Sequence, residues 1–188
     1  MELKPRRVPS VLRKPSALER SLLMTILLRI CQADYSNSLH MHALVGLLDA
    51  YARDPAGGSQ PLSEFARNNL AQALSDRPFM FSVLAFDDSH AGVPVGLVNC
   101  VEGFSTFACQ PLVNVHDVVV ASSHRGQRVG EQMLGFVEQL ARARGACKLT
   151  LEVLAGNLPA QKLYRRVGFG NYQLDPKMGD AQFMQKWL

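Results

Sequence analysis

The stretch LEVLAGNLPAQKLYRRVGF, residues 151–169, decides the fold of this 188-residue chain. It begins inside a short, nearly all-apolar run, residues 147–153, which is typical of a buried central strand. Asn157 then stands where a helix N-cap belongs, with a proline in the first turn. Gly168 ends this helix, whose inward side carries Leu163, Tyr164 and Val167. The stretch therefore predicts a strand, a loop and a helix with one apolar side.

The segment HRGQRVGE, residues 124–131, joins an apolar strand to a long amphipathic helix that runs from Val129 to Gly145. A glycine-bearing turn at a helix start leaves backbone N–H groups unpaired beside the positive end of the helix dipole. Such a turn favours phosphate binding, although an ordinary turn with solvated arginines explains the segment equally well. The glycine patterns of a P-loop and of a dinucleotide fingerprint are absent.

The remaining chain supplies further strands and two helices, separated by loops rich in glycine, proline and aspartate. We expect strands over residues 25–31, 79–86, 93–104, 112–121, 172–174 and 183–187. We expect helices from residue 34 or 36 to about 51 and over 62–74. The order of elements predicts an α/β (α+β) fold with a mixed, mostly antiparallel central sheet of six to seven strands and helices on both faces.

The two motifs, in this order and at this spacing, resemble those of the GNAT superfamily of acyl-CoA-dependent N-acyltransferases. The resemblance covers about residues 25–175. The family pattern N-x-x-A-x-x-[LF]-Y, followed by Gly-Phe, is matched by Asn157, Ala160, Leu163, Tyr164, Gly168 and Phe169. The pattern R/Q-x-x-G-x-G/A is matched at Arg125 and Gly130, whereas Arg128 replaces the middle glycine. An arginine adds a Cβ at this position, and its guanidinium is able to pair with phosphate.

The resemblance implies acetyl-CoA as the cosubstrate and no metal. The strand before the turn is expected to offer backbone hydrogen bonds to the pantetheine arm, and the turn amides to hold the pyrophosphate. These residues are Val118, Val119 and Val120 on the strand, and Arg125, Gly126, Gln127, Arg128, Val129, Gly130 and Glu131 in the turn. Asn157 is expected to contact the pantetheine arm, to cap its helix, or both, and Ala160 belongs to the same site.

The resemblance also places Tyr164 against the thioester sulfur. A phenol with a pKa near 10 is suited to protonate a departing thiolate, and the alternative is an aromatic side chain that only packs in the core.

The base that deprotonates the amine is left open among His116, Asp117, Glu102 and Glu152. His116 is favoured by its titration range. Strand alternation puts His116 and Asp117 on opposite faces, unless the strand carries the bulge that the family usually has there. The pair stands where polyamine-type members carry Glu-Asp, which is a weak likeness. Glu102 and Glu152 are assigned to substrate binding, with a solvated strand edge as the alternative.

The formal net charge of +4 belongs to the beginning of the chain. Residues 1–20 hold six basic and two acidic residues, so the other 168 residues carry 14 of each sign, which does not indicate nucleic-acid binding. We expect a basic, disordered leader over residues 1–23 and the acyltransferase domain over 24–188. The apolar run 22–28 is too short to cross a membrane, and the four cysteines have no paired spacing. These features predict a cytoplasmic protein without a membrane partner, with an Arg-rich targeting peptide as the alternative.

The combined expectation is an N-acetyltransferase that transfers acetyl from acetyl-CoA to a primary amine of a small molecule by direct attack in a ternary complex. The alternatives are a protein N-terminal or lysine acetyltransferase and a non-catalytic CoA-binding regulatory module. A homodimer is left open.

Overall fold

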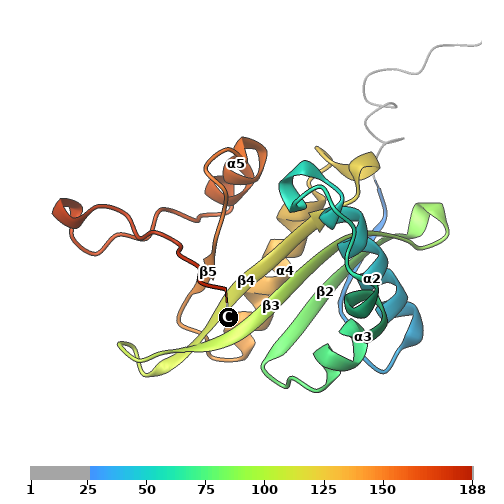
Figure 1. Ribbon diagram of the computed structural model, residues 1–188, viewed down its shortest axis with the longest axis horizontal. Coiled ribbons are helices and arrows are strands. Elements are labelled where there is room, and N and C mark those ends of the chain that lie inside the picture. The colour runs from blue at the N-terminus through green and yellow to red at the C-terminus, as the bar shows by residue number, and fades with distance from the viewer. Residues whose placement is uncertain (1–25, 188) are drawn as a thin grey trace, which may run out of the picture.

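The structure, a computed structural model, describes residues 26–187, and these form one sheet flanked by helices (Figure 1). The five strands lie side by side in sequence order. They are β1 (Leu28–Gln32), β2 (Met80–Asp87), β3 (Val93–Ser105), β4 (Gln110–Val120) and β5 (Leu149–Leu151). Neighbours pair antiparallel from β1 to β4, and β5 pairs parallel with β4. The prediction of a mixed, mostly antiparallel sheet is confirmed.

Helices cover both faces of the sheet, as predicted. On one face lie α2 (Ser38–Ala52) and α3 (Glu64–Ser75), which begin at the side-chain caps Asn37 and Ser63. On the other lies α4 (Val129–Ala143), followed after β5 by α5 (Leu158–Arg166). Short 3₁₀ turns connect these elements at Pro55–Gly57, Asp88–His90, Ser122–His124 and Pro176–Met178.

Two apolar clusters hold the layers together. The amphipathic side of α4 packs its fully buried Met133 and Val137 against alternate residues of β2, β3 and β4, such as Val83. On the opposite face, Leu44 of α2 packs with Leu97 of β3. Because successive strand residues point to opposite faces, the long apolar runs of β2 and β3 fill both clusters.

Two irregularities of β4 shape the site. Asn99 of β3 pairs with Asp117, but its neighbour Cys100 pairs with Val115, so His116 is the extra residue of a β-bulge. In addition, β5 pairs with β4 only as far as Val115, whereas β4 continues to Val120. Within the described chain, β4 therefore has no strand neighbour on that side beyond the bulge.

The prediction of six to seven strands is wrong, because residues 172–174 and 183–187 form no strand in the described chain, and the sheet ends at β5. The apolar side chains there are largely uncovered, since Phe183 is 75% exposed and Trp187 is 87% exposed. A strand needs a hydrogen-bonded neighbour and a covered face, and β5 offers an edge of only three residues. The leader predicted over residues 1–23 lies outside the described residues.

Candidate active site

The glycine-bearing turn before α4 contains two residues in the left-handed backbone conformation. Gly126 has φ +77°, and Arg128, the N-cap of α4, has φ +60°. No side chain caps the first amides of α4, so these N–H groups face outward beside the positive end of the helix dipole. The left-handed conformation at Arg128 explains why glycine is usual there and costs arginine about 1 kcal/mol.

The side chains of the turn divide into anchored and free ones. Arg125 donates to Val120 O at 3.2 Å and to Asp54 Oδ2 at 2.8 Å, which ties the turn to β4 and to the 3₁₀ turn at residues 55–57. Glu131 pairs with Arg166 of α5 at 3.0 Å. Arg128 forms no ion pair with any residue that the structure describes, so its guanidinium is available to an anion.

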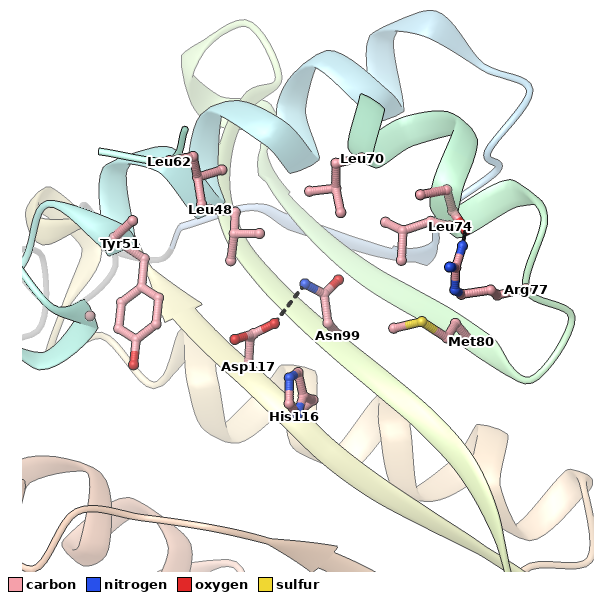
Figure 2. A pocket seen from close by; sticks show the side chains of 13 residues that line it. Leu48, Tyr51, Leu62, Leu70, Leu74, Arg77, Met80, Asn99, His116 and Asp117 are labelled. Atoms are coloured by element: carbon pink, nitrogen blue, oxygen red, sulfur yellow. Dashed lines mark hydrogen bonds between the residues drawn. The ribbon is translucent and has the colours of Figure 1, made fainter. Parts of the chain in front are cut away.

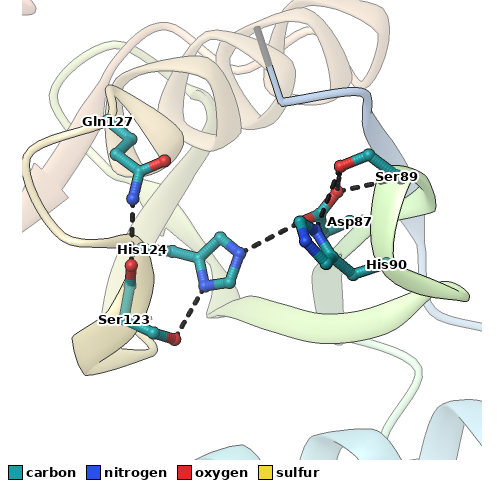
Figure 3. Close-up of polar contacts among 6 residues, drawn as sticks. All are labelled: Asp87, Ser89, His90, Ser123, His124 and Gln127. Carbon is teal, nitrogen blue, oxygen red and sulfur yellow. Dashed lines mark hydrogen bonds and ion pairs between the residues drawn. The ribbon is translucent and has the colours of Figure 1, made fainter. Parts of the chain in front are cut away.

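A buried carboxylate holds the base of this turn (Figure 3). Asp87, at the end of β2, is fully buried and accepts from His124 Nε2 at 3.1 Å and from His90 Nδ1 at 2.7 Å. Hydrogen bonds from Ser89 above all, and from the two histidines, hold the pKa of Asp87 well below its usual range. His124 also lies 2.8 Å from Ser123 Oγ. The ionised carboxylate thus fixes the segment that leads into the turn.

A cavity of about 490 Å³ lies on the other side of β4, under α2 and α3 (Figure 2). Both His116 and Asp117 line it, which the bulge permits, because one extra residue shifts the side-chain alternation. Its other lining residues are Leu48, Tyr51, Ala52, Gly57, Leu62, Leu70, Ala73, Leu74, Arg77, Met80 and Asn99. The size is typical of a site for a small molecule.

A chain of hydrogen bonds runs through the core to Asp117. Asn99 Nδ2 donates to Asp117 Oδ2 at 2.9 Å, and Ser82 Oγ donates to Asn99 Oδ1 at 2.6 Å. The Tyr35 hydroxyl lies 2.9 Å from Ser82 Oγ and donates to it, since the hydrogen of Ser82 is already engaged. Ser82 is fully buried and Asn99 is 4% exposed. The chain therefore orients the Asp117 carboxylate from within the core.

Tyr164 lies on α5, half-buried against the α4 cluster and edge-on to Phe169, with 6.0 Å between ring centroids. Burial above all, then the charges of Tyr51 and Asp117, raises the pKa of Tyr164 to about 12. The phenol therefore keeps its proton at neutral pH.

The remaining predicted residues form hydrogen bonds and ion pairs within the protein. Asn157 caps α5 and accepts from the amide of Ala160 at 3.2 Å. Glu102 pairs with Arg144 at 3.4 Å, and Glu152 accepts from Asn114 at 3.1 Å. Neither of these carboxylates lines the cavity.

The strand and turn residues that were predicted to bind the cofactor lie on two neighbouring segments of the chain. Val118, Val119 and Val120 form the free end of β4, and Arg125, Gly126, Gln127, Arg128, Val129, Gly130 and Glu131 follow it into α4. Gly130 is buried, and a Cβ there would lie 2.9 Å from a methyl of Leu163, so this glycine also allows α5 to approach α4.

Sequence reasoning missed Asn99, Ser82, Tyr35 and Tyr51. A signal existed for two of them, since Ser82 and Asn99 interrupt the apolar runs MFSVLAF and VGLVNCV. A polar residue inside a buried strand needs a hydrogen-bond partner, so each interruption indicates a specific contact.

Two features are absent from residues 26–187. No group of three or more His, Cys, Asp or Glu side chains there is arranged to hold a metal ion. No helix in this range combines the length and apolar character that crossing a membrane requires.

Comparisons with known proteins agree on one family. The chain is 37% identical over 91 residues to a streptothricin acetyltransferase of Streptomyces lavendulae, which covers 47% of this chain and 48% of that protein. This chain thus spans about half the length of that curated relative. The fold matches the crystal structure of a probable acetyltransferase (TM-score 0.70, 24% identity, 85% of this chain and 99% of that one). It also matches AAC(6')-Iy in complex with the bisubstrate analogue CoA-S-monomethyl-acetylneamine (TM-score 0.65, 18% identity, 86% and 99%). The model of the Acetyltransferase (GNAT) family matches residues 44–169, most of the described chain, and the protein belongs to this family.

Proposed function

We propose that the protein is an N-acetyltransferase that transfers the acetyl group of acetyl-CoA to a primary amine of a small molecule. The observation that carries the proposal is the position of the cavity, because Asp117 and His116 lie where β4 separates from β5. The open edge of β4 leads from there directly into the turn before α4. One ligand is thus able to run from the turn along β4 and meet a second ligand at the bulge.

Acetyl-CoA supplies a thioester, which an unprotonated amine attacks directly. The outward amides at the start of α4 and the free guanidinium of Arg128 bind its phosphates. The β4 edge at residues 118–120, which β5 does not reach, orients its arm. Family relatives support this use of CoA, since one of the matching structures holds a CoA bisubstrate analogue.

The acceptor amine requires one group that holds it and one that takes its proton. Asp117, oriented by Asn99, holds the ammonium, and His116 takes the proton, because imidazole is the side chain that most often acts as a general base. Tyr164, protonated at neutral pH, donates a proton to the departing thiolate. Each residue has one role, and the roles are separable by kinetics.

A panel of primary amines tests the function, with free thiol release and product mass as the readouts. Asp117→Asn keeps the hydrogen-bonding shape and removes the charge, so KM for the amine should rise while the Kd of acetyl-CoA stays the same. His116→Gln should instead lower kcat. Absence of both a thermal shift with acetyl-CoA and thiol release with any acceptor would reject the proposal.

We also propose that the domain spans residues 24–188. Deletion of residues 1–23 should leave the Kd of acetyl-CoA and the Tm unchanged, and a Tm several degrees lower would contradict this boundary.

A further inference from the structure

The acceptor cavity is walled mainly by apolar side chains. Leu70 and Leu74, one turn apart on α3, face Leu48 of α2, and Leu62 and Met80 close the ends (Figure 2). All five are buried or half-buried. Such walls favour the hydrocarbon part of a ligand, at about fourfold in affinity for each buried methylene.

The charged side chains that line the cavity match a ligand with a single positive charge. Asp117 is the single carboxylate among the lining residues, and Arg77 is the single one with a permanent positive charge. The Arg77 guanidinium donates to Ala73 O at the end of α3, and Figure 2 shows it on the opposite side of Asp117 from Tyr51. An ammonium bound to Asp117 has a partner, whereas a second ammonium further along meets leucines and a like charge.

The two other carboxylates that the sequence offered as substrate ligands do not alter this balance. Glu102 is paired with Arg144, and Glu152 is bonded to Asn114, both outside the cavity. The second ammonium of a polyamine would therefore find no second carboxylate among the lining residues, despite the weak sequence likeness to polyamine-type members.

We infer that the acceptor is a primary amine on an apolar alkyl or aryl body, with one positive charge, and that amines with several charges are poor substrates. The inference rests on the proposed function and names its substrate class. The transfer forms the amide C–N bond and breaks the thioester C–S bond, and the amine loses one proton while the CoA sulfur gains one.

A matched pair of amines tests the inference on the full chain. Hexylamine and 1,6-diaminohexane share one hydrocarbon chain and differ in the second ammonium. We expect kcat/KM for hexylamine to exceed that for the diamine at least tenfold. Equilibrium binding of both amines to the CoA complex is measured beside turnover, so that the comparison does not depend on catalysis.

Two variants of α3 test whether the cavity sets this preference. Leu70→Glu adds a carboxylate to the wall and should reduce the hexylamine-to-diamine ratio at least fivefold. Phe65→Glu, on the same helix but 76% exposed and outside the lining, should leave the ratio unchanged. A second variant in the wall, Leu48→Glu, should have the same effect as Leu70→Glu. It keeps the test decisive if one of the two variants does not fold.

The outcomes separate the two proposals. Equal or better binding and turnover of the diamine, or an unchanged ratio in both wall variants, overturns the substrate class and leaves the acetyltransferase standing. Turnover only of multiply charged small amines likewise overturns the substrate class alone, whereas turnover only of peptides also overturns the small-molecule acceptor of the proposed function. Absence of acetyl-CoA binding overturns the proposed function itself.

Discussion

Substitution of Ser82 by alanine cuts the buried hydrogen-bond chain at its centre with the loss of one oxygen atom. Asn99 Oδ1 then has no donor in a 4% exposed position, which costs about 1–3 kcal/mol. Tyr35 loses its acceptor but is only half-buried, so water replaces part of that bond. We expect the free energy of unfolding to fall by about 2 kcal/mol. Because Asn99 is then free to rotate, kcat/KM for the amine should fall about fivefold, which corresponds to about 1 kcal/mol.

A double-mutant cycle with Tyr35→Phe distinguishes a chain from two independent contacts. Tyr35→Phe alone should cost about 1 kcal/mol, whereas in the Ser82→Ala background it should cost almost nothing, because its acceptor is already gone. Urea unfolding measures the stabilities, and amine kinetics at saturating acetyl-CoA measures the activity. Ser105→Ala, a buried serine elsewhere on β3, is the control and should lower stability without changing kcat/KM. Additive costs, or unchanged amine kinetics in Ser82→Ala, would refute the reasoning.

Three further predictions concern single residues. Tyr164→Phe keeps the ring packing, so it should lower kcat about 10²–10⁴-fold with an unchanged Kd for acetyl-CoA; a drop below about threefold, with chemistry rate-limiting, contradicts the acid role. Arg128→Gly relieves the left-handed strain but loses the free guanidinium, so Tm should hold or rise while the Kd of acetyl-CoA, measured by titration, rises about tenfold. The depressed pKa of Asp87 means that its ionised form stabilises the fold above the unfolded pKa of about 4 and that this stability is lost as the pH falls from there towards the lower pKa of the folded state. Asp87→Asn should therefore flatten the acid limb of a stability–pH curve, and an equally steep limb would show that other carboxylates cause it.

Local signals were sufficient to predict most elements of the fold. The apolar spacing from Val129 onward predicted α4, which begins at Val129 and buries Met133 and Val137. Asn157 was predicted as a helix start and does cap α5. These features depend on neighbours within one or two turns, so they are readable from sequence. The same residues carry the two motifs, which is why the family was predicted as well.

Features that depend on contacts between distant segments were not predictable in this way. The bulge at His116 is a property of the register between β3 and β4, so the sequence left open whether His116 and Asp117 share a face. The prediction of two terminal strands was wrong for a related reason. The short segment from Phe183 to Trp187 was predicted as a strand, but β5 offers it an edge of only three residues.

The bulge links the two halves of the site through a single strand. Without the extra residue, the alternation of β4 would place His116 and Asp117 on opposite faces, and one of them would point into the α4 cluster. With it, both line the cavity under α2 and α3, while the residues after them still continue straight into the turn before α4. The buried Asn99 pairs with Asp117 across the strands at this irregularity and binds its carboxylate. A polar residue costs little there because the contact satisfies it. The interruption of an apolar strand by Asn99 and the exception to strand alternation at His116 thus meet at one place, where β4 leaves β5 and two polar side chains line the cavity.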